Sequence, residues 1–414
     1  MRIAVLGAGF TGLTASLRLL QMGHQVTLFE KDSTAGGLAG GFKNPNWDWT
    51  LEKSYHHIFT SDNSALSLAQ ELNQKIIFQK PQTDTYINGQ ILPLDDPRSL
   101  MTFPYLSPID KLRTGLALGY LKLLKNYQKL EGTYALPWIR KYMGKKSAKL
   151  IWEPLFTGKF GEFKEDISLT WFWGRVKKRT PTLCYPAGGF QEFANKISTK
   201  IISLGGEILL NTEVKNIEDL SRKFDKTIVT LPLPVFLKNT PNLPKKYVQQ
   251  LSSIPHLSAQ VLILILKKPF LKESYWLNIN DPGFPFLVLA EHTNFMDPKH
   301  YGNQHILYIG NYLPNDHPYL KKSPQELLKI FTPYLKKINP QYPLSPQLPS
   351  SPYLFTQPFA QPVMQVGFEK IIPQFKTPLK NIYLANMAMV YPWDRETNYA
   401  IEMGEKIAEE INAD

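Results

Sequence analysis

The chain opens with Met1-Arg-Ile-Ala-Val-Leu-Gly7-Ala-Gly9-Phe-Thr-Gly12, an apolar run followed by glycines in the spacing Gly-x-Gly-x-x-Gly. The run predicts a β-strand, and residues 13–22 predict a helix that Gly23 ends. Residues 24–29 predict a second strand, which closes on Glu30. A strand, a glycine-rich turn, a helix and a second strand ending at an acid together predict a site for a dinucleotide.

Each glycine of this motif has a physical task. A missing side chain at Gly7 permits the tight turn, Gly9 lets the backbone approach a pyrophosphate, and Gly12 lets helix and strand pack closely. The first turn of the helix offers unpaired N–H groups to phosphate oxygens. Glu30 can accept hydrogen bonds from ribose hydroxyls. The predicted cofactor residues of this segment are Gly7, Gly9, Phe10, Thr11, Gly12, Glu30 and Lys31.

A second glycine pair follows six residues after Glu30, in the stretch Gly36-Gly37-Leu38. An acid followed by such a pair resembles the extension found in glutathione-reductase-like flavoproteins. The resemblance implies that the dinucleotide is FAD rather than NAD. It adds Gly36, Gly37 and Leu38 to the predicted cofactor residues.

The composition, 43% hydrophobic and 12% aromatic over 414 residues, fits a globular chain with two domains. The one cysteine, Cys184, excludes an internal disulfide, a CxxC redox pair and a multi-cysteine zinc site. Redox chemistry must therefore come from a cofactor. No metal site is predicted, because no cluster of histidines shows the spacing of zinc ligands.

The net charge of +12 favours an anionic partner such as lipid or a phosphorylated substrate, although a solvated basic surface is the simpler explanation. The sequence has no nucleic-acid-binding motif, so we expect no nucleic-acid partner. No targeting signal precedes the first strand, and the longest uncharged apolar run, 254–266, is too short to cross a bilayer. We therefore expect a cytoplasmic protein, of unknown oligomeric state.

Two kinds of segment alternate along the chain. Residues 1–60, 185–255 and 376–414 predict an α/β, Rossmann-like FAD-binding domain of the glutathione-reductase type, built from discontinuous segments. Residues 61–184 and 256–375 predict an α+β substrate-binding domain with a helical subregion. The expected elements include a hairpin at 86–91, helices at 66–72, 107–130, 147–156, 168–178, 190–204 and 397–412, and strands at 207–210, 214–217, 225–231, 259–266, 286–291, 305–312 and 381–385.

Four blocks resemble the flavin amine oxidase superfamily, above all its protoporphyrinogen-oxidase-like and phytoene-desaturase-like branch. The first block is the glycine motif with Glu30 and the second glycine pair, and the last runs from Asn381 to Gly404. The stretches 185–190 and 225–232 support them. The resemblance covers nearly the whole chain. It implies an FAD-dependent oxidoreductase that removes a hydride from a small hydrophobic or lipid-like substrate.

The same resemblance implies further cofactor residues. Val214 should pair its backbone with the adenine. The strand that ends at Asn386 should meet the ribityl or pyrophosphate region, although relatives usually have Gly followed by Asp or Glu there. The resemblance places five residues around the flavin edge: Asp394, Arg395, Thr397, Asn398 and Tyr399.

The segment Lys53-Ser-Tyr-His-His-Ile-Phe59 carries two histidines, which ordinarily titrate near neutrality and can move a proton. Adjacent residues of an extended segment face opposite ways, so at most one of them points at the flavin. We expect His57 in the catalytic role and place His56 among the substrate candidates; a packed or surface histidine is an equal alternative. The segment also resembles part of UDP-galactopyranose mutase, another FAD protein.

Arg175 and Arg179 lie one helical turn apart, where two guanidinium groups can clamp a carboxylate or a diphosphate. A solvated basic face is the alternative. Arg175 and Arg395 join His57 as predicted catalytic residues. The other candidates for binding substrate are Arg179, His292, Asn294 and Tyr312.

Residues 107–130 predict a basic amphipathic helix with a broad apolar face. Such a helix can lie in the headgroup layer of a membrane, which would make the protein peripheral on the inner face of the membrane. The alternative is that the apolar face packs on the substrate domain.

Two enzymatic hypotheses remain, besides a flavin-binding scaffold. The first is the oxidoreductase. The second is a redox-neutral sugar-nucleotide isomerase that resembles UDP-galactopyranose mutase and uses reduced FAD; the segment 55–59 and the paired arginines favour it. The C-terminal block resembles the oxidoreductase branch better, so we prefer the first.

Overall fold

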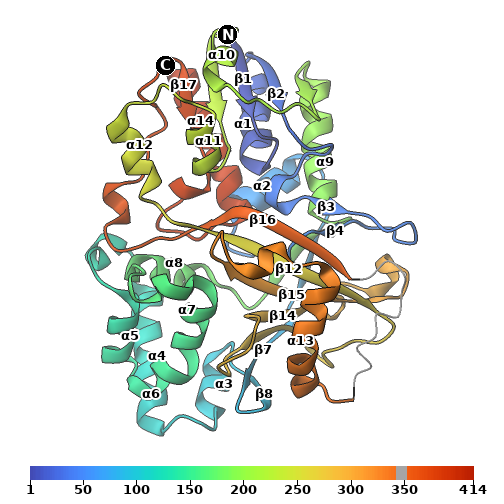
Figure 1. Cartoon of the computed structure of the whole chain (residues 1–414), viewed down its shortest axis with the longest axis vertical. Helices are drawn as coiled ribbons and strands as arrows, with labels where there is room; N and C mark the ends of the chain where they lie inside the picture. The colour runs from blue at the N-terminus through green and yellow to red at the C-terminus, as the bar shows by residue number, and fades with distance from the viewer. Residues whose placement is uncertain (342–351) are drawn as a thin grey trace.

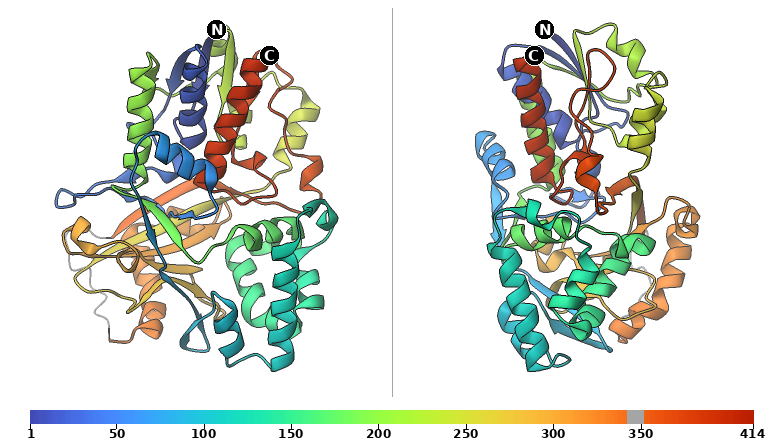
Figure 2. Two further views of the ribbon diagram at one scale, coloured as in Figure 1. Left: turned by 180° about the vertical axis from the view of Figure 1, so that it is seen from behind. Right: turned by 90° about the vertical axis from the view of Figure 1, so that its left-hand side faces the viewer.

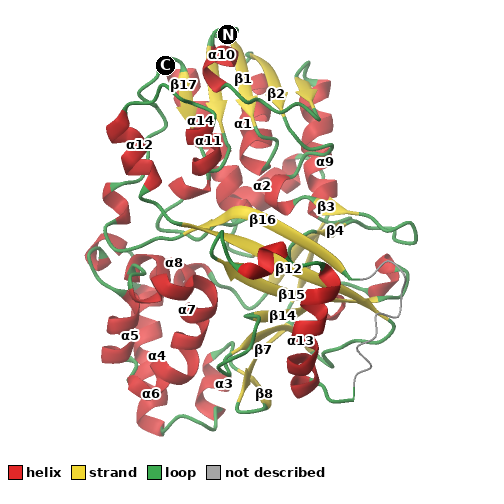
Figure 3. Ribbon diagram, in the orientation of Figure 1, coloured by secondary structure: helices red, strands yellow, loops and turns green. Residues whose placement is uncertain are grey.

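The computed structural model describes residues 1–341 and 352–414. Figures 1 and 3 show three parts: a parallel sheet flanked by helices near both termini, a larger sheet across the middle, and a cluster of helices beside the larger sheet. One hydrophobic core runs through the first sheet, the helical cluster and one face of the second sheet, and a separate cluster fills the other face.

The first sheet has five parallel strands, of which the edge strand β10 is partly exposed and the other four are buried along most of their length. In spatial order they are β10 (Glu207–Leu209), β2 (Gln25–Phe29), β1 (Arg2–Leu6), β11 (Lys226–Val229) and β17 (Ile382–Leu384). They come from all three segments assigned above to the FAD-binding domain. Because the strands are parallel, the loops at their carboxyl ends gather along one edge.

Three helices lie side by side on one face of this sheet: α9 (Phe190–Ser203), α1 (Phe10–Gln21) and α14 (Thr397–Ala413), as Figure 2 shows from behind. Gly404 allows α14 to approach α1, since a Cβ there would lie 2.5 Å from the backbone oxygen of Thr11. The other helices of this region are α2 (Asn63–Glu71), α10 (Ile217–Ser221), α11 (Leu233–Lys238) and α12 (Lys245–Ser252).

The second sheet has seven strands and is antiparallel except for one pair, β13 with β7. In spatial order its strands are β16 (Tyr353–Pro362), β12 (His256–Leu266), β15 (His305–Leu313), β14 (Val288–Glu291), β13 (Ser274–Ile279), β7 (Gln82–Ile87) and β8 (Gln90–Pro93). Every residue of β12 is buried, because both of its faces are covered. The helix α13 (Pro324–Ile338) packs Leu327, Phe331 and Leu335 against one face.

The helical cluster contains α3 (Pro97–Thr102), α4 (Pro108–Leu123), α5 (Ala135–Tyr142), α6 (Lys145–Ser147), α7 (Glu153–Phe160) and α8 (Leu169–Lys178). Two small sheets connect the parts. They are β5 (Ile58–Phe59) with β9 (Leu183–Pro186) and β6 (Ile76–Gln79), and β3 (Gly41–Phe42) with β4 (Leu51–Glu52).

The fold class predicted from the sequence is confirmed, as is the hairpin, whose turn residues Asn88 and Gly89 have φ of 50° and 75°. Two element predictions are wrong. The helix expected over 107–130 ends at Leu123, and a separate 3-10 turn covers Tyr127–Leu130. Residues 214–217 form no strand, because Asn216 caps α10 by accepting from the backbone N–H of Asp219.

Candidate functional site

A cavity of about 320 Å³ lies along the carboxyl edge of the first sheet, between the two sheets. Its wall combines the glycine loops, the loop after β10, the start of α14 and part of β16. Twelve of the predicted cofactor residues line it: Gly7, Gly9, Phe10, Thr11, Glu30, Lys31, Gly36, Gly37, Leu38, Val214, Asn386 and Thr397. His56 and Arg395 line it as well.

The floor of the cavity is a tight contact between the two glycine segments. Gly9 and Gly36 form an isolated parallel bridge, and a Cβ on Gly37 would lie 2.8 Å from the Cα of Gly9. Gly12 lies behind the turn, where a Cβ would lie 1.9 Å from the carbonyl oxygen of Gly7. Glycine at these positions therefore leaves a bare backbone surface that a ligand can approach.

Two helices begin at this cavity with their first N–H groups uncapped. Among the described residues, no side chain caps α1 at Gly9 or α14 at Glu396, and neither helix has an acid in its first turn. The N-terminus of a helix carries a partial positive charge and free donors. The cavity thus offers two places for anionic ligand groups, one near the glycine motif and one at Thr397.

Glu30 and Asn386 fix the loops around the cavity. The Glu30 carboxylate accepts from the backbone N–H of Ala8 at 2.7 Å and of Asp32 at 3.0 Å. The Asn386 amide donates to the carbonyl of Leu231 at 3.0 Å. A bare glycine floor, two free helix starts and an acid at the end of β2 fit an extended dinucleotide such as FAD.

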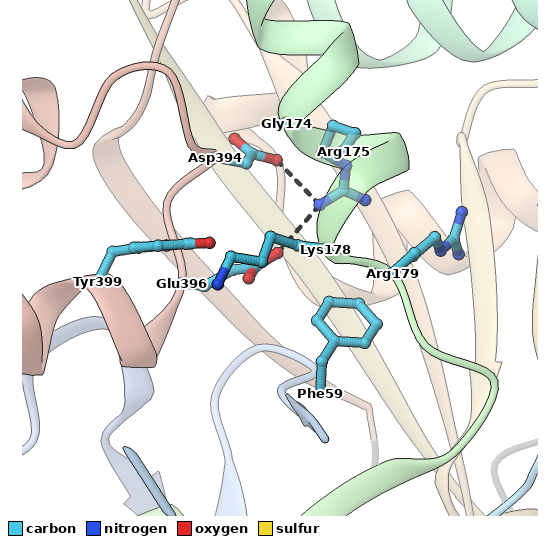
Figure 4. Close-up of a pocket in the computed structure, with 8 residues that line it drawn as sticks. All are labelled: Phe59, Gly174, Arg175, Lys178, Arg179, Asp394, Glu396 and Tyr399. Carbon is cyan, nitrogen blue, oxygen red and sulfur yellow. Dashed lines mark hydrogen bonds and ion pairs between the residues drawn. The ribbon is translucent and has the colours of Figure 1, made fainter. Parts of the chain in front are cut away.

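Behind the wall lies a buried charge cluster centred on Asp394 (Figure 4). The carboxylate of Asp394 binds the Lys159 ammonium at 2.9 Å and the Arg175 guanidinium at 3.1 Å. Burial alone would raise the pKa of Asp394, but these two cations hold it well below its usual range. Arg175 also binds Glu396 at 3.2 Å. The cluster joins α7 and α8 to the loop before α14.

Arg395 connects the cavity to the second sheet. Its Nη2 donates to the Tyr312 hydroxyl at 2.7 Å, and its Nε donates to the Gln361 side chain at 3.2 Å. Lys159 lies 5.0 Å from the centre of the Tyr312 ring. Burial would raise the pKa of Tyr312, yet the positive charges of Arg395 and Lys159 bring it below its ordinary value.

Glu396 is a site residue that the sequence reasoning missed. It lines the cavity and also a small pocket beside Arg175 and Arg179 (Figure 4), and so separates the two. Its Oε2 is buried and has no hydrogen-bond partner among the described residues. Burial raises the pKa of Glu396 to about 8, although Arg175 opposes the shift. This carboxyl therefore titrates close to physiological pH.

The two adjacent histidines face different surroundings. His56 lines the cavity, and its Nδ1 donates to the carbonyl of Ser54 at 2.7 Å. His57 lies 3.2 Å from the Tyr275 hydroxyl and is outside the cavity lining. Burial lowers the pKa of His56 to about 4 and, with Arg179 and Arg175 adding to it, that of His57 to about 3. The expectation of a histidine that titrates near neutrality is therefore wrong for both.

Arg175 and Arg179 do not form one clamp. Arg175 is engaged with Asp394 and Glu396, whereas Figure 4 shows the Arg179 guanidinium turned away toward the far side of Phe59. Within the described residues, Arg179 makes no side-chain hydrogen bond or ion pair. Burial and the nearby Arg175 lower the pKa of Arg179 to about 10.

Aromatic side chains surround the segment that carries the histidines. The Tyr55 ring packs edge-on against Trp276 with centroids 4.9 Å apart, and His57 lies 5.9 Å from the same indole. Tyr55 also covers Gly310 of β15, where a Cβ would lie 2.5 Å from its ring. Aromatic rings therefore pack the histidine segment against β13 and β15 of the second sheet.

Four other predicted residues lie outside the cavity lining and have structural partners. Asn398 accepts from the backbone N–H of Ala65 at 3.1 Å, and Tyr399 stacks on Trp393 at 5.6 Å. His292 pairs with the Tyr301 hydroxyl at 2.8 Å inside the core. The Asn294 amide donates to two backbone carbonyls, those of Leu271 and Ser274, each at 2.9 Å. These bonds fix elements to one another.

The cavity also contains residues that no local pattern indicated. Thr230, His256 and Phe359 line it, and so does Lys53, the first residue of the histidine segment. Phe359 belongs to β16, more than a hundred residues from Thr230, so only the folded chain brings them together. In the described part of the chain, no group of three metal-ligating side chains occurs, and no helix has the length and apolarity needed to cross a membrane.

Known structures share this fold over essentially the whole chain. A cyclohexylamine oxidase from Brevibacterium oxydans superposes with a TM-score of 0.74 at 16% identity, covering 100% of this chain and 98% of that one. A reduced UDP-galactopyranose mutase superposes with a TM-score of 0.77 at 17% identity, covering 99% and 95%. At such identities the similarity supports the fold alone.

Sequence relatives match shorter stretches. A protein named probable zeta-carotene desaturase, from Synechococcus elongatus, is 26% identical over 179 residues, which are 37% of each chain. A 4,4'-diapophytoene desaturase from Staphylococcus haemolyticus is 49% identical over 51 residues, 12% of this chain and 10% of that protein. The match thus spans little more than a third of the first of these desaturases and a tenth of the second. The model of the flavin containing amine oxidoreductases matches residues 10–412, and the chain belongs to this family.

Proposed function

We propose that this enzyme oxidises a small hydrophobic organic substrate by removing a hydride from a C–H or C–N bond. The observation that carries the proposal is the position of the cavity between the two sheets, where its lining residue Arg395 donates to the Tyr312 hydroxyl of the second sheet. Bound FAD supplies the acceptor for the hydride. The protein's part is to hold the cofactor, orient the substrate and manage the proton.

The residues of the cavity have separate tasks in this proposal. The start of α1 at Phe10 and Thr11 receives the pyrophosphate, and Glu30 receives the ribose hydroxyls. In this proposal the backbone of Val214, which lines the cavity, pairs with the adenine. The free start of α14 at Thr397 lies where it can stabilise negative charge on the reduced ring system.

The aromatic surroundings support an apolar substrate. Phe359 lines the cavity, and Tyr312 lies next to its wall, where its hydroxyl accepts from Arg395. Relatives named carotene or diapophytoene desaturases share parts of this sequence. We therefore propose an isoprenoid-like or other lipid-like substrate, with peripheral contact to a lipid surface.

Glu396 is the residue best suited to exchange a proton at this site. A group with a pKa of about 8 is a far better base near neutrality than His57, whose pKa is about 3. Arg175 keeps the carboxyl of Glu396 in place, and Arg395 fixes the Tyr312 hydroxyl nearby. In this proposal His57 instead contributes to the aromatic wall as a neutral ring.

One observation favours the isomerase as a second candidate. Arg179 presents a guanidinium without a partner among the described residues, beside a pocket that also touches the flavin cavity wall. Such a group suits an anionic substrate such as a sugar nucleotide. The two candidates therefore differ in whether the substrate carries a phosphate.

Anaerobic visible spectroscopy of the purified holoenzyme tests the proposal. Candidate substrates are added one at a time: an isoprenoid lipid extract, a porphyrinogen, amines and UDP-galactose. Bleaching of the oxidised flavin by a hydrophobic compound, without another reductant, is the expected result.

Photoreduction of the same sample is the control, since it shows that the flavin can accept electrons. If no compound bleaches the flavin, and chemically reduced enzyme interconverts a sugar nucleotide without net oxidation, the isomerase is correct and the oxidoreductase proposal fails.

A further inference from the structure

The helix α4 has two apolar faces, and only one of them is buried. Thr114, Ala117 and Leu121 point into the helical cluster and are buried. On the opposite side, five large hydrophobic residues follow the spacing of a helical stripe. This outer face consists of Ile109, Leu112, Leu116, Tyr120 and Leu123.

The outer face is strongly exposed. Ile109, Leu116 and Leu123 are 70%, 66% and 80% accessible, and Leu112 and Tyr120 are at least half accessible. Five of the fifteen exposed large hydrophobic side chains in the described part of the chain lie on this one helix. Figure 2 shows α4 at the outer edge of the helical cluster, with no described element covering its outer side. Such a concentration on a surface marks an interaction site.

Aromatic side chains extend the outer face onto α5. The rings of Tyr120 and Trp138 stack with centroids 6.4 Å apart, and Trp138 lies 4.9 Å from Tyr142. Lys141 places its ammonium 5.1 Å from the centre of the Tyr142 ring. Tyrosine and tryptophan beside lysine are the side chains that prefer the boundary between water and lipid.

The charge around the outer face is predominantly positive. The stretch 97–152 contains eleven lysines and arginines and two acids, Asp110 and Glu131, and so carries nine of the twelve excess positive charges of the chain. Lys125, Lys129, Lys145, Lys146 and Lys149 are exposed. An apolar stripe within a basic surface complements a layer of anionic headgroups over hydrocarbon.

We infer that the outer face of α4 docks the protein on an anionic lipid surface, with the five hydrophobic side chains inserted among the headgroups and the lysines paired with lipid phosphates. A second protein chain would need acidic side chains to match this surface, whereas an anionic bilayer supplies both the negative charge and the hydrocarbon. The inference assigns the peripheral lipid contact of the proposed function to a named surface, and it does not depend on the substrate, because it concerns a surface and not the cavity.

Helix α4 also contacts helix α8, which contains Arg175 and is capped at its C-terminus by Arg179. The Lys122 ammonium donates to the backbone carbonyls of Lys177 and Arg179, each at 2.9 Å, at the end of α8. Helix α4 is therefore hydrogen-bonded directly to the end of α8, the helix that supplies Arg175 to the candidate site. This places the lipid surface on the substrate-binding side of the molecule.

Cosedimentation of the FAD-loaded full-length protein with vesicles tests the inference. One set of vesicles is phosphatidylcholine, and the other contains phosphatidylglycerol in addition. The wild type is expected to bind the anionic vesicles more strongly. The variant Leu112→Ser/Leu116→Ser/Leu123→Ser is expected to lose on the order of tenfold in partitioning, because binding scales with the apolar area inserted.

The matched control is Ile202→Ser/Leu204→Ser/Leu210→Ser, which removes three exposed aliphatic side chains from the other end of the molecule. It should bind as the wild type does. Flavin absorbance and thermal midpoint show that both variants fold.

Three outcomes would overturn the inference. They are equal binding of the wild type and the α4 variant, equal binding to neutral and anionic vesicles, and a wild-type dimer that the α4 variant converts to monomer. The last outcome would assign the outer face to a second copy of the chain.

Discussion

The position of Glu396 changes the acid–base behaviour of its carboxyl. Its carboxyl lies between the large cavity and the small pocket beside Arg175 and Arg179, and burial raises its pKa to about 8. A charge that appears on the cavity wall shifts the electronic transitions of a bound flavin. We expect the absorption spectrum of the oxidised holoenzyme to change with a midpoint near pH 8, and the variant Glu396→Gln to lose this change.

The variant Glu402→Gln on the same helix serves as its control, since Glu402 pairs with Lys406 at 2.6 Å and does not line the cavity. It should keep the spectral transition. A transition that persists unchanged in Glu396→Gln would remove Glu396 as the titrating group.

At this scale, the sequence predicts best the residues whose task is local. Gly7, Gly9 and Gly37 could be found because a turn and a close backbone approach require glycine wherever the rest of the chain lies. The partners of Asp394 could not, because Lys159 and Arg175 reach it from helices more than two hundred residues away. The lowered pKa of His57 could not be predicted either, because it results from burial and from two arginines at the end of α8.

The contact between α1 and α14 gives a prediction for whole elements. A Cβ at Gly404 would lie 2.5 Å from the Thr11 oxygen and 2.7 Å from the Thr14 Cβ, so Gly404→Ala must push the helices apart. Overpacking of this kind costs about 1–3 kcal/mol of unfolding free energy. Because Thr11 lines the cavity, FAD should bind more weakly as well.

The same substitution at a second glycine should raise the free energy of unfolding instead of lowering it. Gly119 lies within α4, and a Cβ there would meet nothing within 4 Å. Gly119→Ala should therefore stabilise the protein by roughly 0.5–1 kcal/mol, through helix propensity. Urea denaturation of both variants measures the difference, and a Gly404→Ala protein as stable as Gly119→Ala would contradict the close packing.

Local sequence patterns predict the presence of a helix or strand better than the residue at which it ends. The amphipathic pattern over 107–130 correctly indicated a helix but not its end at Leu123, because apolar residues continue into the 3-10 turn. The strands β13 and β16 and the helix α13 are not among the elements predicted from the sequence. Their conformation depends on the tertiary fold, because β16 pairs with β12, β13 pairs with β14 and β7, and α13 is held by burial of its apolar face.

For the whole molecule, the pH dependence of stability follows from buried acids and buried histidines with opposite effects. Burial raises the pKa of Glu52 to about 7 and that of Glu291 and Glu396 to about 8. The folded protein then keeps protons that the unfolded chain releases above about pH 4.5, so these groups make stability fall as pH rises toward 8.

Four histidines change the pH dependence of stability in the opposite direction. Burial lowers the pKa of His56 and His256 to about 4 and of His57 and His292 to about 3. The unfolded chain takes up protons on them below about pH 6.5, so they make stability rise with pH up to that value and add nothing above it. Between about pH 6.5 and 8 only the glutamates remain, and stability should fall.

Urea denaturation of the wild type across this interval measures the slope, to which each of the three glutamates contributes at most about 1.4 kcal/mol per pH unit. Glu291→Gln should reduce it, because the amide stays neutral in both states and occupies the place of the protonated acid beside the backbone N–H of Phe270 and Leu271. The exposed Glu409→Gln should leave it unchanged. A stability that rises from pH 6.5 to 8 would mean that the buried glutamates are ionised in the folded protein, and that cations or water reach them there.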